Sequence, residues 1–344
     1  GGGVERARGV FEIQGQAHVR VSGLKLIGGG QRGRSGFLLR RAHHVTIQGC
    51  HTLRTGSSGV KLIECRDVVV DGNEIERACL SGAEECITVK MDSDCVRVSN
   101  NHIHDCRKEG IDVKEGARNV RVSGNHIHHV ERQGLYTDAW DRETFNVEFS
   151  GNVIHDCGFG IAACSETGGL LHDVRICNNV VYNCAGPGLV LADWGRGENH
   201  PVRSVAFINN TVHRCGSRWG GGMHFYTTEA ENVLVRNNIF SLCGPPPVDM
   251  RKEPVSRRID HNLFHGPDRA FGLAAVRGDP LFVDADGGDF RLRPGSPAID
   301  AGSPEEAPGR DIGGRERPWG DGMDIGAWEY TGGTQAGKKQ GERQ

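Results

Sequence analysis

Short segments in which apolar and polar residues alternate recur along most of the chain. Eight of these segments end in Asn: VVVDGN, VRVSNN, VRVSGN, VEFSGN, VRICNN, VAFINN, VLVRNN and RIDHN. The Asn residues stand at positions 73, 101, 125, 152, 179, 210, 238 and 262, which are 24 to 31 residues apart. A period in this range is typical of stacked repeats, and alternation with a period of two predicts strands rather than helices.

Two earlier copies, VRVSGL and VTIQGC, place Leu24 and Cys50 in the Asn column, so ten copies cover about residues 18–265. Five residues after each Asn, small or apolar residues form a second column: Ala78, Cys106, Val130, Cys157, Cys184, Cys215 and Cys243. A Gly-containing turn then leads into a second alternating strand, as in CITVK, GIDVK, GLYTD and GLVLA. One coil is therefore expected to be strand, turn, strand and loop. The chain is predicted to be an all-β, single-stranded, right-handed parallel β-helix of about ten coils.

The two columns have structural explanations. Asn tolerates the left-handed conformation of a tight turn, and its amide can form hydrogen bonds with the coils on both sides. The Cys column is expected to contain buried free thiols, since parallel side chains in register rarely present the torsion that a disulfide needs.

The repeat defines the expected domain boundaries. Residues 1–278 should form the β-helix. Residues 279–330 should fold over the open end of the stack, because a repeat array needs a distinct cap to cover its last apolar face. Residues 331–344 contain almost no apolar side chains and should be disordered.

Composition changes this prediction little but excludes some functions. The net charge of -3 and a pI near 6.6 do not favour binding to nucleic acid. No run of 18 apolar residues predicts a membrane span, and the first residues do not have a signal-peptide pattern. We expect a monomer that is secreted or periplasmic in a bacterial-type cell.

Candidate binding residues follow from the second strand of each coil, because residues between inward apolar positions must face outward. Charged and aromatic residues gather on this face in the middle coils, next to the small residues Ala162, Cys164, Val190 and Ala192. The adjoining loops add three Trp residues, whose rings suit stacking on sugars. The expected substrate-binding residues are Lys90, Asp112, Tyr136, Trp140, Asp193, Trp194, Arg218, Trp219, His224 and Tyr226.

Asp138 and Glu166 are the candidate catalytic acids. They belong to successive coils, which predicts carboxyl groups roughly 5 to 9 Å apart, the range used in glycoside hydrolysis. Lys114 should lie beside Asp138 and keep it ionised as nucleophile or base. Glu166, in the less polar context of CSETGG, should retain a proton and act as the general acid.

These motifs support a resemblance. YTDAW with Asp138, CSETGG with Glu166 and the following RICNNVVYN resemble the β-xylosidase group of glycoside hydrolase family 120 and neighbouring β-helical hydrolases. The phrases DPLFVDADGGDFRLRPGSPAIDAG and DIGAWEY resemble the ends of many secreted β-helix proteins. The resemblance implies a carbohydrate-active enzyme that cleaves a poly- or oligosaccharide. The longer loop AWDRETFN and the lack of a recognisable second domain depart from that pattern.

Two other functions remain open. A polysaccharide lyase or uronate epimerase could use Lys90, Lys114 and Arg218 to neutralise a uronate, and Tyr136, His224 or Tyr226 to transfer protons. In a lyase, Ca²⁺ would be the expected cofactor, with its candidate ligands being Asp112, Glu115, Asp138 and Asp141. A non-catalytic glycan-binding β-helix is the other alternative.

No cofactor is expected for a hydrolase. The phrases NHIHDC and NHIHHV are not interpreted as a metal site, on the expectation that alternation places only one His of each pair outside.

Overall fold

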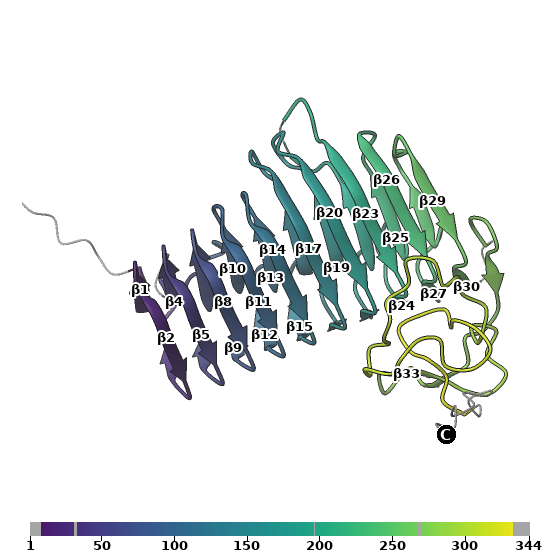
Figure 1. The fold of residues 1–344 in the computed structure, drawn as a ribbon, viewed down its shortest axis with the longest axis horizontal. Helices are drawn as coiled ribbons and strands as arrows, with labels where there is room; N and C mark the ends of the chain where they lie inside the picture. Colours follow the sequence, from purple (N-terminus) through teal and green to yellow (C-terminus); the bar gives the residue numbers. More distant parts are fainter. Residues whose placement is uncertain (1–7, 31–32, 196, 267–269, 333–344) are drawn as a thin grey trace, which may run out of the picture.

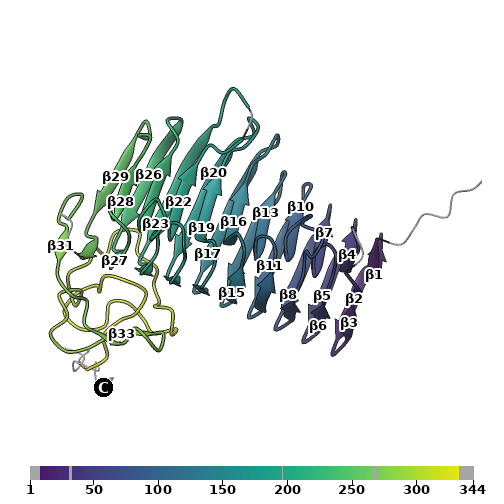
Figure 2. The ribbon, with the colours of Figure 1, turned by 180° about the vertical axis from the view of Figure 1, so that it is seen from behind.

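The computed structural model describes residues 8–30, 33–195, 197–266 and 270–332, and these residues form the predicted β-helix. Three long parallel sheets run along the stack, and each coil contributes one strand to each sheet (Figures 1 and 2). We name them sheets A, B and C. No helix occurs in the described ranges.

The strands of sheet A, in spatial order, are β1 (Gly9–Gln14), β4 (Ser35–Arg40), β7 (Val60–Ile63), β10 (Ile87–Lys90), β13 (Ile111–Lys114), β16 (Gln133–Asp138), β19 (Phe159–Cys164), β22 (Leu189–Ala192), β25 (Met223–Tyr226) and β28 (Val248–Met250). Sheet B contains β2 (Ala17–Ser22), β5 (His43–Gln48), β8 (Arg66–Asp71), β11 (Asp94–Ser99), β14 (Arg118–Ser123), β17 (Thr144–Ser150), β20 (Leu171–Cys177), β23 (Val202–Ile208), β26 (Ala230–Arg236) and β29 (Arg257–Asp260). The spatial order in both sheets follows the sequence, so every neighbour is the next coil.

Sheet C contains shorter strands: β3 (Lys25–Ile27), β6 (His51–Leu53), β9 (Glu74–Glu76), β12 (His102–Cys106), β15 (His126–Val130), β18 (Val153–His155), β21 (Val180–Tyr182), β24 (Thr211–His213), β27 (Ile239–Ser241), β30 (Leu263–His265) and β31 (Val276–Arg277). The sequence analysis expected two strands per coil, so it missed this third strand. Most of these strands have only three residues between the Asn and Cys columns, too few for alternation to be recognised.

The Asn column joins the coils as predicted. The side chain of Asn152, for example, donates to Asn179 Oδ1 at 2.9 Å, and its own Oδ1 accepts from the backbone N of Asn125 at 3.0 Å. The expected left-handed conformation lies one residue earlier, as at Gly151 and Asn178, with φ of 66° and 54°. The Asn side chains therefore act as a hydrogen-bonded ladder, and the preceding residue makes the turn.

The interior is filled by apolar side chains in register, which form one continuous core along the stack. The Cys column lies in or beside this core, and all twelve cysteines are free. The prediction of unpaired thiols is confirmed.

Residues 279–330 lie along the side of the helix and not over its end. They carry the hairpin of β32 (Phe282–Asp284) and β33 (Asp289–Leu292). Phe282, Phe290 and Ile325 pack with Val180 and Ile239 on the outer face of sheet C. Figure 1 shows this yellow segment beside β24 and β27.

The expected position of residues 279–330 is therefore wrong. The segment covers apolar side chains that sheet C exposes in its last coils, while Ala270 and Ala275 pack against the core at the end of the stack. Of the predicted disordered tail, residues 333–344 lie outside the described ranges.

Candidate active site

The outer face of sheet A carries the predicted candidate residues in two columns. Parallel register places Asp112 beside Tyr136, and Tyr136 beside Ala162 and then Val190. In the second column Lys114 lies beside Asp138, and Asp138 beside Cys164. The inward assignment made from the sequence is confirmed, since Ile111, Val113 and Leu135 lie in the core. The alternate side chains lie outside this core but do not face solvent as expected: Asp112, Tyr136 and Asp138 are 1%, 4% and 2% exposed.

Lys114 lies in a nearly buried set of charges. Its Nζ is 2.7 Å from Glu85 Oε1 and 3.1 Å from Asp112 Oδ2. Burial tends to lower the pKa of Lys114, but the charges of Asp112 and Glu85 outweigh it, so that the pKa lies well above its usual range. Lys114 is therefore a firmly protonated ammonium group.

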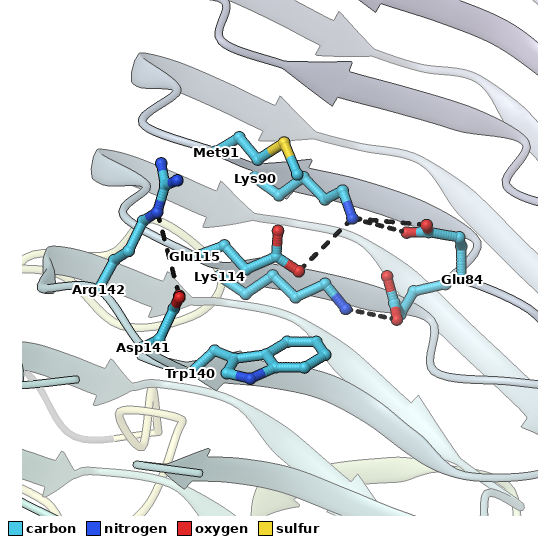
Figure 3. A pocket seen from close by; sticks show the side chains of 9 residues that line it. Glu84, Lys90, Met91, Lys114, Glu115, Trp140, Asp141 and Arg142 are labelled. Carbon is cyan, nitrogen blue, oxygen red and sulfur yellow. Dashed lines mark hydrogen bonds and ion pairs between the residues drawn. The ribbon is translucent and has the colours of Figure 1, made fainter. Parts of the chain in front are cut away.

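Lys90, one coil earlier, forms a second set of ion pairs. Its Nζ is 3.4 Å from Glu84 and 3.5 Å from Glu115. Glu84 also binds Lys61 at 2.7 Å. Figure 3 shows the two lysine side chains extended side by side toward the glutamates of the loop before β10.

A groove of about 540 Å³ lies over these ion pairs. It is lined by Glu84, Glu85, Lys90, Met91, Lys114, Glu115, Trp140, Asp141 and Arg142. Trp140 is 43% exposed, so its ring is available to a ligand (Figure 3). Of the predicted site residues, Lys90, Lys114 and Trp140 line this groove, and Asp138 and Glu166 lie outside its lining.

Asp138 differs from the expectation in its protonation. Its side chain is only 2% exposed, and its Oδ1 has no hydrogen-bond partner. Burial is the main cause that raises the pKa of Asp138 well above its usual range, and the charge of Glu166 adds to it. Lys114 lowers this pKa, but its ammonium contacts Glu85 and Asp112. Burial thus shifts the pKa of Asp138 in the direction opposite to the effect expected of Lys114.

Glu166 follows β19 and lies on the same face as Asp138. Its Oε1 accepts a hydrogen bond of 2.5 Å from the Tyr136 hydroxyl group. Tyr136 comes from the preceding coil and is 4% exposed. The phenol therefore holds the Glu166 carboxylate next to the sheet face that carries Asp138.

Aromatic rings continue from Tyr136 toward the C-terminal coils. The Trp194 ring lies 6.3 Å from Tyr136, and Phe159 contacts both Trp194 and Trp219, at 6.1 and 5.2 Å between centroids. Trp219 in turn meets His224 at 5.0 Å. Trp219 is 39% exposed, which leaves part of this aromatic row open to a ligand.

Some of the other predicted binding residues form ion pairs, and one is exposed at the surface. Asp193 binds Lys252, whose Nζ also lies 4.2 Å from the ring centre of Tyr226. His224 binds Asp249 at 3.0 Å. Arg218 is exposed in the loop next to Trp219.

Sequence reasoning missed Glu84 and Glu85. They precede β10 in the phrase GAEECITVK, outside the alternating strand that was used to find candidates. The sequence did contain a signal that could have identified them, because two adjacent acids stand in a loop one coil before Lys114. Arg142, which binds Asp92 at 2.7 Å, was also missed in the long loop after β16.

The four acids suggested for Ca²⁺ do not meet at one point among the described residues. Asp112 binds Lys114, Glu115 binds Lys90, and Asp141 faces Arg142 at 4.0 Å. These three acids are thus engaged with cations of the protein, and no group of possible metal ligands found among the described residues contains any of the four.

The histidines of NHIHDC and NHIHHV lie together on the outer face of sheet C. Residues two apart in a strand face the same side, so His102 and His104 both point outward, as do His126 and His128. The expectation of one outward His per pair is wrong. His102, His126 and His128 offer nitrogen atoms that all lie within 4.8 Å of one another.

Comparisons with known proteins agree with the architecture. The family model described as "Right handed beta helix region" matches residues 35–202. The pectate lyase Pel9A has a similar structure, with a TM-score of 0.61 and 16% identity over 88% of this chain and 75% of that chain. No curated protein matches the chain.

Two further structures share the fold at lower identity. The endo-xylogalacturonan hydrolase from Aspergillus tubingensis gives a TM-score of 0.56 with 9% identity, over 80% of both chains. The mannuronan C-5 epimerase AlgE6 A-module from Azotobacter vinelandii gives a TM-score of 0.54 with 12% identity, over 76% of this chain and 69% of that chain.

Within the described residues, no helix is long and apolar enough to cross a membrane.

Proposed function

We propose that this right-handed parallel β-helix is a carbohydrate-active enzyme that hydrolyses glycosidic bonds, using Asp138 and Glu166. The observation that carries the proposal is the unequal environment of two carboxyl groups on one sheet face. Asp138 is buried with an unpartnered oxygen and a raised pKa, while Glu166 accepts a hydrogen bond from Tyr136. Pairs of carboxyl groups whose environments differ in this way divide acid and base roles in glycosidases.

The roles that follow are the reverse of those expected from the sequence. Asp138, whose pKa burial raises, would be the general acid that donates a proton to the leaving oxygen. Glu166, held by Tyr136, would act as nucleophile or base. Lys114 would remain a positive charge beside Asp138 and limit how far the pKa of Asp138 rises.

The substrate that suits this face is a neutral poly- or oligosaccharide. The groove lining contains four acids and three bases: Glu84, Glu85, Glu115 and Asp141 against Lys90, Lys114 and Arg142. The lysine ammonium groups are already paired, so a uronate chain would find little free positive charge. Trp140 and Trp219, each partly exposed, would stack on sugar rings.

The lyase and hydrolase names among the similar structures belong to proteins at most 16% identical, so they support a glycan-active fold without choosing the reaction. A β-elimination needs a base for the proton at C5, for which the sequence offered Tyr136, His224 or Tyr226. Two of these are buried and engaged: Tyr136 donates to Glu166, and His224 contacts Asp249. An enzyme acting on polymeric glycans would work outside the cytoplasm, which is our proposal for its location.

A panel of neutral and uronate-containing polysaccharides tests the proposal. New reducing ends without ultraviolet absorbance of an unsaturated uronate support hydrolysis. Absorbance of that product would instead show a lyase, and binding without any product would show a glycan-binding protein. Either result would overturn the hydrolase proposal.

The carboxyl assignment has its own test. Asp138→Asn and Glu166→Gln should each lower kcat by at least about 100-fold, the usual contribution of acid–base catalysis. Asp249→Asn, three coils beyond Glu166's coil on the same sheet, is the matched control and should retain activity. Full activity in both site variants would contradict the assignment.

A further inference from the structure

The outer face of sheet C carries five histidines in the middle coils, which we call the histidine patch: His102, His104, His126, His128 and His155. They come from the three consecutive strands β12, β15 and β18. Register places His102 beside His126, and His104 beside His128 and then His155. The patch lies on a different sheet from the groove and from the candidate catalytic acids.

The imidazole nitrogens converge within the patch. His102 Nε2 lies 2.9 Å from His128 Nε2, and His126 Nε2 lies 2.9 Å from His155 Nε2. One nitrogen each from His102, His126 and His128 lie within 4.8 Å of one another. An ion bound at about 2.1 Å from each nitrogen needs them about 3.4 Å apart. The His102 and His128 nitrogens are slightly closer than this, at 2.9 Å, and the other pairs of the trio lie within 4.8 Å, so small ring movements would complete the site.

Of the three converging histidines, His128 has its second nitrogen held by a neighbour, since its Nδ1 lies 2.7 Å from His129 Nδ1. The carboxylate contacts of the patch are made by the two adjoining histidines: His104 Nδ1 lies 2.8 Å from Asp105, and His155 Nδ1 lies 2.7 Å from Asp156. A partner on the second nitrogen is usual around histidine ligands, since it directs Nε2 toward the ion. Glu74, 3.4 Å from His104 Nε2, adds an oxygen at the edge of the patch.

We propose that His102, His126 and His128 bind a divalent transition-metal ion, with Zn²⁺ as the expected ion. Imidazole nitrogen is a ligand that suits Zn²⁺, Cu²⁺ and Ni²⁺, whereas Ca²⁺ and Mg²⁺ prefer oxygen. The rigid parallel register holds the three rings before any ion arrives, so binding costs little ordering of the chain. The site is independent of the proposed hydrolase activity.

Zn²⁺ titration of the full chain tests the proposal. The protein is first treated with EDTA and dialysed, and its Zn²⁺ affinity is then measured by calorimetry and by competition with a chromogenic chelator. We expect one Zn²⁺ per chain. His126→Gln and His128→Gln should each weaken binding at least about tenfold. His172→Gln is the matched control, because His172 lies on sheet B with its own acidic partners and should leave the affinity unchanged.

A spectroscopic readout separates bound metal from a loss of folding. Co²⁺ should give visible absorption bands of a histidine-bound ion in the wild type and in His172→Gln, and these bands should be lost in His128→Gln while its circular dichroism stays that of the wild type. Equal Zn²⁺ affinity in all variants, or no binding by the wild type, would show that the rings form only a structural stack and would overturn the proposal.

Discussion

Asp138 and Lys114 show that burial can outweigh a neighbouring opposite charge at the scale of single residues. The register places a lysine beside the aspartate, which by itself favours the carboxylate. The lysine, however, has two closer acidic partners, and Asp138 is left with an unpartnered oxygen. The pKa of Asp138 is therefore raised by burial and not lowered by its lysine neighbour.

Tyr136→Phe tests how far Glu166 depends on its phenol partner. The change removes one hydrogen bond to a carboxylate, a contact that typically contributes about 1.5 to 3 kcal/mol. Under the proposed function, kcat should fall about 10- to 100-fold while the thermal midpoint changes little. Steady-state kinetics on the active glycan measure this, and an unchanged kcat would show that the Tyr136 contact has no part in catalysis.

Lys114→Met should destabilise the fold strongly. It leaves Glu85 and Asp112 buried without their cation, and breaking a buried ion pair in this way typically costs about 3 to 5 kcal/mol. Urea denaturation measures the change. Arg41→Met is the control, since its pair with Glu64 is exposed to solvent and should contribute far less to stability. Similar losses in the two variants would contradict the role assigned to burial.

At the scale of the repeated element, the Asn ladder explains why the coils keep register although their lengths vary from 24 to 31 residues. Extra residues enter the loops on both sides of sheet A, as between β9 and β10 and between β22 and β23. In the longest coil, from Asn179 to Asn210, the ladder hydrogen bond is still 3.0 Å. Sequence alone reveals this column because Asn recurs there. It does not reveal the three-residue strands of sheet C, whose alternation is too short to detect.

Asn152→Ala should cost about 3 kcal/mol or more in the free energy of unfolding. The Asn152 amide donates to Val122 O and Asn179 Oδ1, and its oxygen accepts from the N and Nδ2 of Asn125. Each buried group left without a partner costs about 1 to 3 kcal/mol. Ser150→Ala, at a half-buried position of the same turn, should cost much less in the same urea titration. Equal effects would argue against the ladder as a main source of stability.

At the scale of the whole molecule, stacking order could be predicted from the sequence because each coil repeats the same phrase and pairs with the next. The alternation of apolar and polar residues within each repeat also predicted which side chains lie on the outer face of sheet A, and most of the candidate residues are among them. It could not show which ion pairs Lys114 forms, since Glu85 lies in a loop outside the repeat. Nor could it place residues 279–330, because the apolar outer positions that they cover, such as Val180 and Ile239, look like ordinary strand residues.

The C-terminal segment is attached to the helix by buried polar contacts as well as apolar ones. Arg317 binds Glu329 at 2.6 Å with both side chains fully buried, and it also donates to Asn178 of the helix. Asn209 and Asn237 donate to backbone oxygens of Asp324 and Ser303. The segment is therefore an integral part of the folded unit, and its ionisation affects the stability of the whole.

Asp324 provides a test of how ionisation in the C-terminal segment affects the stability of the protein. Burial raises its pKa to about 7. An unfolded chain releases this proton near about pH 4. Between these values the folded protein holds a proton that the unfolded chain has lost, so stability falls as pH rises through this window and is constant above it. The free energy of unfolding that is lost through this one carboxyl as the pH rises is at most about 4 kcal/mol.

Asp324→Asn should therefore reduce the difference in unfolding free energy between about pH 5 and about pH 8, measured by urea denaturation. The amide cannot accept from both Asp300 N and Tyr330 N, so the variant should be less stable than the wild type at the lower pH. Asp289→Asn is the matched control. Hydrogen bonding to Arg291 lowers the pKa of Asp289, so this aspartate is ionised in both states throughout that range. A pH dependence in Asp324→Asn as large as in the wild type would mean that the buried Asp324 carboxyl does not set it.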